Sequence, residues 1–417
     1  MKPFPSLLGL ASCWKDYSGY QKISIDFKSA DVGRKIVSYL ETLPSYDEWQ
    51  LDQQRVEFIV SQDDHHVLLT AMDDFFHDIE SVKSSRFSIP EPDVPTGLYL
   101  EEYDQYLTND QLDEWFDWLA ISFSDLDNGF VLRQEEIGRS YENRAMKGFS
   151  LRNPSKDLPW IVIDCGIHSR EFISHATCRN LLINLAECAA NDASCDTEFS
   201  NFYEFNWYIM PNLNPDGYEY NWTTDRMWRK NRTPTQGSIC KGVDLNRNSD
   251  IAWSTVGASG EPCSNTYYGT GPFSEPEMAA WNTTIGSIHE QGKIEVYISF
   301  HAYAQKLLSS WAVDFSIIAD EPPTLEELQA AGAAASQAMT EQHGETYLYG
   351  QSRDSLYPSS GTSKDYAMDV LEVPLSWTWE LRDTGEYGFL LPSDQIMPVW
   401  DEVKAGLIEV AKYVLGK

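Results

Sequence analysis

The chain has 417 residues, of which 42% are hydrophobic and 13% aromatic, and it carries a formal net charge of −33. This length allows about two to three domains of ordinary size, and the negative charge argues against nucleic acid or an anionic membrane as a partner. No apolar run approaches the roughly 20 residues that a helix needs to span a bilayer.

The first 13 residues have the features of a short secretory signal. One basic residue precedes a brief apolar stretch and small residues that suit cleavage. Two early prolines are unusual in such a segment, so a disordered start is the alternative. Seven cysteines occur, six of them between residues 165 and 263, and an even set is typical of secreted proteins with disulfides. We therefore expect an extracellular protein, with reduced cysteines in a cytosolic enzyme as the alternative.

Residues 14–87 have the pattern of a small α+β domain. Apolar and polar residues alternate, as in strands, over 20–27 and 55–61. Apolar residues recur at helical spacing over 30–43 and 65–82.

A proline-rich stretch without periodicity follows at residues 88–97, and it predicts a linker to a second domain at 98–417. Lys83 and Arg86 come just before this linker. The sequence therefore predicts basic cleavage points at the end of the second helix.

The second domain alternates apolar strands with helices. This alternation predicts an α/β fold, with a mixed, mostly parallel sheet and helices on both faces. The predicted strands are 159–166, 203–218, 293–303 and 373–383, and the predicted helices are 174–190 and 393–416.

Polar residues follow several of these strands, where ligand sites form in open α/β sheets. His168 and Glu171 follow the first strand, His301 ends the third, and Glu380 ends the fourth. Two histidines and one carboxylate make a catalytic zinc set that leaves one position open, and Glu380 is a candidate base. Each residue alone is more often a hydrogen-bonded structural group, and a bare His-x-x-Glu is weak evidence. The combination is what indicates a metal site.

Six segments, in the same order, resemble the motifs of zinc procarboxypeptidases of the carboxypeptidase A/B family. The resemblance covers nearly the whole chain, and six ordered motifs are a highly specific signal. The segments are HSRE (168–171), RMWRKNR (226–232), GVDLNRN (242–248), SFHAY (299–303), LYPSSGTSKDY (356–366) and TWELRDTGEYGFLLP (378–392).

The resemblance implies one Zn²⁺ per chain, held by His168, Glu171 and His301. It also implies that Glu380 takes a proton from the attacking water and later passes it to the leaving amine, as a carboxylate can do. Arg229 would polarise the scissile carbonyl and stabilise the oxyanion.

The resemblance further implies that the partners are peptide or protein C-termini. Asn246, Arg247 and Tyr357 would bind the terminal carboxylate, since a guanidinium matches it with two hydrogen bonds. Arg170 resembles the family's arginine of a secondary subsite.

The family's architecture gives the two domains their expected roles. Residues 14–87 would be an inhibitory pro-domain and 98–417 the catalytic domain of a zymogen that an activating protease cleaves. We expect a monomer. The resemblance also implies two disulfides, while the pairing of Cys188 and Cys195 stays open: Cys165–Cys178 and Cys240–Cys263.

Family members differ in substrate preference at one position on the floor of the specificity pocket, seven residues after the tyrosine. An aliphatic residue there accompanies apolar C-terminal residues, and an aspartate accompanies Lys and Arg. Counting from Tyr357 gives Lys364, which is similar to the basic residue of acidic-preferring members. We therefore predict release of C-terminal Glu, and of Asp less well.

Two alternatives remain open. Lys364 could be neutralised by Asp314 or Asp365, which would leave an enzyme that prefers apolar C-terminal residues. The chain could also be an inactive family member that binds peptide termini as a recognition module.

Overall fold

The computed structural model describes residues 15–43, 46–65, 67–68, 79–87, 103–124, 126, 129–190, 199–313 and 325–416. The signal-like segment at 1–13, the linker at 88–97, Cys195 and Asp314 lie outside these ranges. None of the helices in them combines the length and the apolar character of a membrane-spanning segment.

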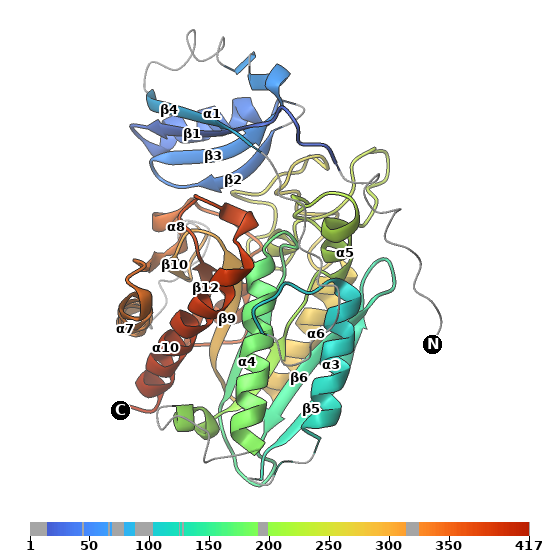
Figure 1. Cartoon of the computed structure of the whole chain (residues 1–417), viewed down its shortest axis with the longest axis vertical. Helices are drawn as coiled ribbons and strands as arrows, with labels where there is room; N and C mark the ends of the chain where they lie inside the picture. Colours follow the sequence, from blue (N-terminus) through green and yellow to red (C-terminus); the bar gives the residue numbers. More distant parts are fainter. Residues whose placement is uncertain are drawn as a thin grey trace.

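The described strands form two separate sheets (Figure 1). The N-terminal domain has a four-stranded antiparallel sheet of order β2-β3-β1-β4. Its elements are β1 Gln21–Phe27, α1 Ala30–Leu40, β2 Asp47–Leu51, β3 Arg55–Val60 and β4 Ile79–Arg86.

The N-terminal domain has a hydrophobic core of its own. Ile23, Ile25 and Phe27 alternate along β1, so they point to one face of the sheet, and all three are buried. Ile36 and Leu40 of α1 belong to the same cluster. The predicted strands at 20–27 and 55–61 and the predicted helix from residue 30 are present as β1, β3 and α1.

The helix predicted for residues 65–82 is wrong at its C-terminal end. Residues from Ile79 onward form strand β4, so Lys83 and Arg86 lie in a strand and not at a helix end. Lys83 is opposite Ser24 and Arg86 opposite Gln21 in the ladder with β1. Pairing with β1 decides the structure here, because short polar segments have little conformational preference of their own.

The second domain contains an eight-stranded sheet of order β11-β10-β12-β9-β7-β8-β6-β5. Four of its neighbouring pairs are parallel and three are antiparallel, so the predicted mixed, mostly parallel sheet is confirmed. The strands are β5 Val131–Arg139, β6 Ala145–Arg152, β7 Trp160–Cys165, β8 Asn206–Met210, β9 Ile294–Ala302, β10 Lys306–Ser309, β11 Leu348–Gln351 and β12 Leu375–Leu381.

Helices cover both faces of this sheet, as predicted. Trp281 of α6 contacts Tyr297 on one face, while Gly406 of α10 lies against Trp379 on the other. Helices α4, α7 and α10 lie on the same side in Figure 1. The helices are α3 Asn109–Ser122, α4 Phe172–Ala190, α5 Pro215–Thr223, α6 Pro276–Gln291, α7 Leu325–His343, α8 Ser352–Ser355, α9 Ser363–Asp369 and α10 Ile396–Val414, with 3-10 turns at Phe199–Glu204, Leu245–Arg247, Gly388–Leu390 and Ser393–Gln395.

The strand predicted for residues 203–218 is shorter than expected. Strand β8 ends at Met210, and α5 begins at Pro215. Asn214 caps this helix by accepting a hydrogen bond from the Gly217 amide at 2.9 Å, and proline is well suited to a first helical position.

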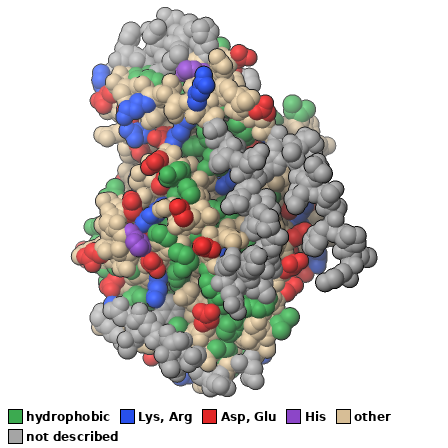
Figure 2. Space-filling view, viewed as in Figure 1, with side chains coloured by type: hydrophobic (Ala, Val, Ile, Leu, Met, Phe, Trp, Pro, Cys, Tyr) green, Lys and Arg blue, Asp and Glu red, His purple; other side chains and the backbone are tan. Residues whose placement is uncertain are grey.

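The carboxyl ends of β7, β9 and β12 reach the same edge of the large sheet, because these strands run parallel. This edge faces the N-terminal domain, whose strand β2 lies nearest to it (Figure 1). On the face drawn in Figure 2, several basic side chains lie on the N-terminal domain, whereas acidic side chains are scattered over the molecule.

Candidate metal and substrate site

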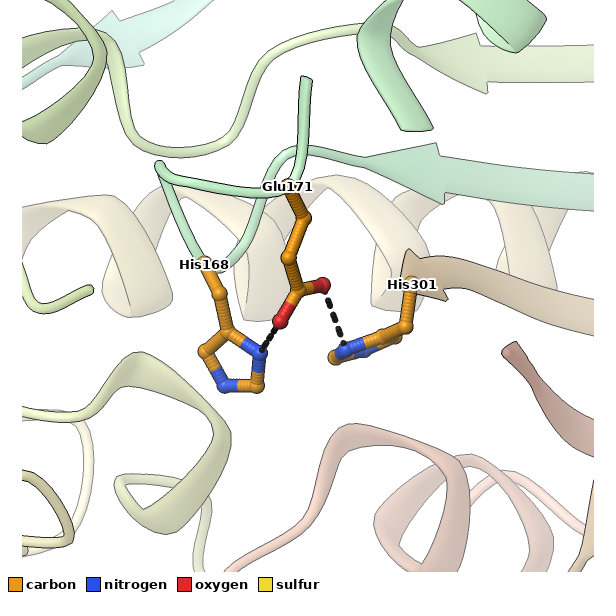
Figure 3. A group of neighbouring side chains, drawn as sticks. All are labelled: His168, Glu171 and His301. Atoms are coloured by element: carbon orange, nitrogen blue, oxygen red, sulfur yellow. Dashed lines mark hydrogen bonds and ion pairs between the residues drawn. The ribbon is translucent and has the colours of Figure 1, made fainter. Parts of the chain in front are cut away.

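His168, Glu171 and His301 meet at the sheet edge (Figure 3). One ligand atom from each lies within 4.8 Å of the others, and all three side chains are buried. The Glu171 carboxylate stands between the two rings. Its Oε1 is 2.8 Å from His168 Nδ1, and its Oε2 is 3.1 Å from His301 Nδ1.

The loop after β7 is fixed at several points. Ser174 accepts a hydrogen bond from the Gly166 amide at 3.0 Å and donates one to the Phe300 carbonyl at 2.6 Å. This ties the loop to β9, the strand that carries His301. The disulfide between Cys165 and Cys178 joins the end of β7 to α4. The two histidines, 133 residues apart in sequence, are thereby held side by side.

The protonation of the cluster suits a metal ion. Burial lowers the pKa of His301 to about 4, which keeps its imidazole neutral. Burial alone would raise the pKa of Glu171, but the two histidines bring it below its usual value, so the side chain is a carboxylate. Two imidazole nitrogens and a carboxylate oxygen are the donors of catalytic zinc sites.

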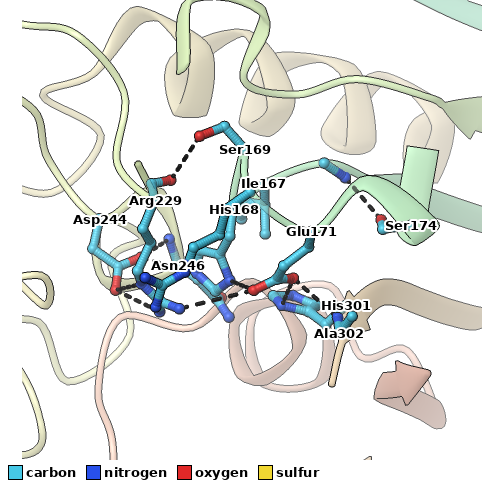
Figure 4. Close-up of polar contacts among 12 residues, drawn as sticks. Ile167, His168, Ser169, Glu171, Ser174, Arg229, Asp244, Asn246, His301 and Ala302 are labelled. Atoms are coloured by element: carbon cyan, nitrogen blue, oxygen red, sulfur yellow. Dashed lines mark hydrogen bonds and ion pairs between the residues drawn. The ribbon is translucent and has the colours of Figure 1, made fainter. Parts of the chain in front are cut away.

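Asp244 contacts the ring nitrogen of His168 that faces away from Glu171 (Figure 4). Its Oδ1 lies 3.2 Å from His168 Nε2, and its Oδ2 accepts a hydrogen bond of 2.8 Å from Arg229. Burial would raise the pKa of Asp244, but Arg229 and His168 bring it well below its usual value. An ionised acceptor at Nε2 leaves the lone pair of Nδ1 directed at Glu171. Metal-binding histidines usually donate their other ring N–H to a carboxylate in this way. We did not predict Asp244 from the sequence, although it lies inside the GVDLNRN segment.

Glu380 lies opposite His301 in the ladder between β12 and β9. It lines the same cavity as the three metal-site residues. Burial and the Glu171 carboxylate raise the pKa of Glu380 well above its usual value. A carboxylate with a raised pKa is a stronger proton acceptor near neutral pH.

The residues expected to bind a terminal carboxylate are brought together as well. Arg247 donates a hydrogen bond of 3.1 Å to the Tyr357 hydroxyl. Asn246 Oδ1 accepts a 3.0 Å hydrogen bond from the Ser363 amide, which leaves its amide nitrogen available. Asn246, Arg247, Tyr357 and Arg229 all line the cavity. Burial lowers the pKa of Arg229, but Asp244 and Glu171 more than offset this and raise it overall.

Lys364 is 3% exposed and lines the cavity. No ion pair or hydrogen bond joins its ammonium group to another side chain in the described ranges. Oδ2 of Asp365 accepts hydrogen bonds from the Ala312 and Val313 amides at 2.8 and 3.1 Å, and the charge of Asp365 acts on Lys364 without an ion-pair contact. Asp314 is outside the described residues. Burial lowers the pKa of Lys364.

Two hydroxyl groups of the cavity that Lys364 lines also lack partners. Thr362 Oγ1 and Thr378 Oγ1 are buried, and neither makes a hydrogen bond within the part of the chain that the structure describes. Both residues line the cavity that Lys364 lines. Buried polar atoms normally have partners, so this end of the cavity is chemically incomplete without an occupant.

Arg170 donates hydrogen bonds to the N-terminal domain. The guanidinium donates to the Asp47 carboxylate and to the Glu48 carbonyl, each at 2.7 Å, and it stacks on Phe389 at 4.1 Å. Trp49 of the same strand packs against Phe389 with ring centroids 5.5 Å apart. The remaining cavity has a volume of about 100 Å³, against roughly 300–1,000 Å³ for most ligand pockets.

Both disulfides implied by the resemblance are present. Cys240 and Cys263 are bonded, as are Cys165 and Cys178. The pairing of Cys195 falls outside the described residues.

Comparisons with known proteins place the chain in a family. The family described as "Zinc carboxypeptidase" matches residues 115–406. Carboxypeptidase B of Astacus astacus is 40% identical over 315 residues, covering 75% of this chain and 98% of that protein. Human carboxypeptidase O is 35% identical over 326 residues, covering 78% and 83%. The chain belongs to the zinc carboxypeptidase family and is a metallocarboxypeptidase, so the predicted family and enzyme class are confirmed.

Solved structures extend the match over both domains. The crystal structure of thrombin activatable fibrinolysis inhibitor has a TM-score of 0.82 and 28% identity, and it covers 96% of this chain and 99% of its own. Carboxypeptidase A from Helicoverpa armigera shares the fold, with a TM-score of 0.81 and 22% identity over 95% of this chain and 98% of its own.

Proposed function

We propose that this chain is a secreted zymogen that removes C-terminal Glu, and less readily Asp, from peptides and proteins. Membership of the zinc carboxypeptidase family carries the class of reaction. The observation that carries the acidic preference is the unpaired, buried ammonium group of Lys364 in the cavity.

His168, Glu171 and His301 would hold one zinc ion per chain. Zinc bound there lowers the pKa of water and polarises a carbonyl group. Glu380 would accept the proton of the attacking water and then donate it to the leaving amine, a role that its raised pKa favours. Arg229 would stabilise the negative charge on the carbonyl oxygen.

Asn246, Arg247 and Tyr357 would bind the terminal carboxylate of the substrate. Arg247 presents a planar guanidinium, which can form two parallel hydrogen bonds with a carboxylate. Binding at this point requires a free C-terminus. The enzyme would therefore be an exopeptidase.

The pocket around Lys364 suits an acidic side chain. A buried ammonium without a partner is costly, and a substrate carboxylate would remove that cost. The hydroxyls of Thr362 and Thr378 can donate to the same carboxylate, which in its ionised form only accepts hydrogen bonds. Glu would fit better than Asp if its longer side chain is needed to reach the pocket floor.

The experiment that tests this preference is a kcat/KM series with activated enzyme on blocked dipeptides ending in Glu, Phe and Lys. The wild type would prefer Glu, and Lys364→Ile would lose that preference. Lys156→Ile is a matched control, because Lys156 is exposed and away from the cavity. A wild type that prefers Phe would favour the alternative of an apolar-preferring enzyme. An inactive module would bind zinc and turn over none of the three.

We also propose that residues 14–87 are an inhibitory pro-domain, joined by the linker at 88–97 to the catalytic domain at 98–417. Strand β2 supports this role, since Glu48, Trp49 and Leu51 line the cavity beside the metal-site residues. The contacts of Asp47 and Glu48 with Arg170 would exclude a peptide from that arginine.

A trypsin-like protease that activates the chain would have to cut within strand β4. The sequence has no Lys or Arg from residue 87 to 132, so Lys83 and Arg86 are the nearest basic residues before the second domain. Both lie in β4 and are paired with β1, so the end of β4 would have to open first. Limited trypsin treatment would raise the activity sharply, and an unchanged rate would count against the zymogen.

A further inference from the structure

We propose that Asp164, acting through Ser299, fixes the orientation and tautomer of His301 and is therefore a positioning residue of the metal site. This inference rests on the zinc site proposed above. It concerns His301, the histidine of the site that Asp244 does not contact.

Three residues form a chain across two neighbouring strands. Asp164 of β7 lies opposite Ser299 of β9 in the parallel ladder. Ser299 and His301 are two residues apart on β9, so their side chains point to the same face. Ser299 Oγ donates to Asp164 Oδ1 at 2.6 Å, and His301 Nε2 lies 3.1 Å from Ser299 Oγ.

The direction of each hydrogen bond follows from the donors available. Asp164 Oδ2 accepts a hydrogen bond of 3.1 Å from the Trp281 indole and another from the Tyr297 hydroxyl. An indole N–H can only donate, so the carboxylate is the acceptor at the centre of this group. Ser299 has one hydroxyl proton, and it goes to Asp164. The Ser299 oxygen therefore presents a lone pair to His301, whose Nε2 must carry the proton.

This assignment leaves the lone pair on His301 Nδ1. That nitrogen faces Glu171 Oε2 at 3.1 Å, the position where a metal ligand is needed. Two facing lone pairs repel each other, and a cation between them removes the repulsion. Asp244 fixes the tautomer of His168 in the same way, but by direct contact with Nε2. Each histidine is therefore oriented by a buried carboxylate, His168 directly and His301 through Ser299.

Asp164 occupies a place that a hydrophobic residue would fill at lower cost. It is fully buried in a central strand whose other residues include Ile161, Val162 and Ile163. An ionised carboxylate there is expensive unless it is hydrogen-bonded. Three donors satisfy it, and the Ser299 bond connects its charge to a metal ligand, which raises the basicity of that ligand.

The test compares Ser299→Ala and Asp164→Asn with the wild type in the full-length protein. Zinc affinity is measured by competition with a chelating dye, and the visible absorption of the Co²⁺-substituted protein reports the ligand geometry. We expect each variant to bind zinc roughly 10–100-fold more weakly, as is usual when a group that orients a metal ligand is lost, and to shift the Co²⁺ bands. The double variant would lose no more affinity than the worse single one, since both act on one path.

Trp281→Phe is the control, because it removes a donor to Asp164 that does not touch His301. It would lower the melting temperature but leave zinc affinity within about twofold of the wild type, since it acts on the fold and not on the ligand. A folded Ser299→Ala protein with wild-type zinc affinity and Co²⁺ spectrum would overturn the relay, and so would an equal loss of affinity in Trp281→Phe. A wild-type chain that binds no zinc would overturn the proposed metal site and the relay together.

Discussion

The polar atoms at the two ends of the cavity differ in whether they have hydrogen-bond partners within the chain. At the metal end, both oxygens of Glu171 and both nitrogens of His168 and His301 have polar partners within the chain. At the pocket end, the two threonine hydroxyls have no hydrogen-bond partner in the described ranges, and burial of the Lys364 ammonium lowers its pKa despite the charges of Asp365 and Glu380.

The polar groups at the metal end are positioned by the chain itself, whereas those at the pocket end can gain partners only from a ligand. Paired groups keep a fixed geometry, which catalysis needs. Unpaired buried groups each cost about 1–3 kcal/mol, and a ligand that supplies their partners recovers that cost. Arg170 is intermediate, because Asp47 and the Glu48 carbonyl of the N-terminal domain bind it, while the Met227 carbonyl and the Phe389 ring of the second domain contact it as well.

The largest expected effect concerns the metal end. Glu380→Gln keeps the shape of the side chain but cannot accept a proton, so kcat should fall by roughly 10²–10⁴-fold, the usual contribution of a general base. Activity assays on purified protein with its zinc content measured in parallel would check this. A loss below about tenfold, with zinc retained, would assign the base to another group.

The second prediction concerns the raised pKa of Asp164, which is buried next to the metal site. Burial raises the pKa of Asp164 from 3.8 to about 6, so between these values the folded protein binds the proton more tightly than the unfolded chain. The contribution of Asp164 to the free energy of unfolding is then present at low pH and is lost as the pH rises through this window, by about 3 kcal/mol. Asp164→Asn has no such titration.

The measurement for this prediction is urea unfolding of metal-free protein from pH 4 to pH 7. The wild type should lose stability relative to Asp164→Asn as the pH rises. A constant difference between the two proteins would show that Asp164 has an ordinary pKa.

The third prediction concerns Arg170. Asp47→Ala removes one of its two partners in β2, so the unprocessed chain should cleave substrate roughly 5–150-fold faster, the range that about 1–3 kcal/mol of lost contact gives. Asp52→Ala is the control, since Asp52 makes no contact with Arg170: it accepts hydrogen bonds from the Gln54 and Arg55 amides at 2.9 and 2.8 Å and lies 3.9 Å from Lys306. Equal rates for Asp47→Ala and wild type before proteolysis would contradict an inhibitory role for this contact.

The smallest effects are expected for the two hydroxyls of the pocket. Thr362→Val and Thr378→Val keep the volume of the side chain and remove one donor each. Activity on a substrate ending in Glu should fall about fivefold in each, the ratio given by ~1 kcal/mol, with activity on Phe unchanged. Parallel losses on both substrates would mean that the hydroxyls only support the fold.

The sequence identified the parts of the site that lie in short motifs. His168 with Glu171 could be recognised because they follow an apolar strand, and Glu380 because it lies at the end of one. The relay from Asp164 to His301 could not, since it depends on the register between β7 and β9. The state of Lys364 also depended on the fold, because the backbone amides of residues 312 and 313 decide where Asp365 points.

The N-terminal domain was less predictable than the metal end. Strand β2, which contacts Arg170, was not predicted, and residues 79–82 were assigned to a helix. Both segments are short strands whose conformation is set by pairing with β3 and β1. Local patterns carry little information about such segments.

The most direct test of the unpaired pocket is the ratio of kcat/KM for two blocked dipeptides that end in Glu and in Gln. The two side chains have nearly the same shape, but the amide of Gln carries donors that would face the Lys364 ammonium and the two hydroxyls. The activated enzyme should favour Glu by at least roughly tenfold, because a charge-assisted hydrogen bond is worth about 1.5–3 kcal/mol. Equal rates, or a preference for Gln, would show that the pocket does not recognise a carboxylate.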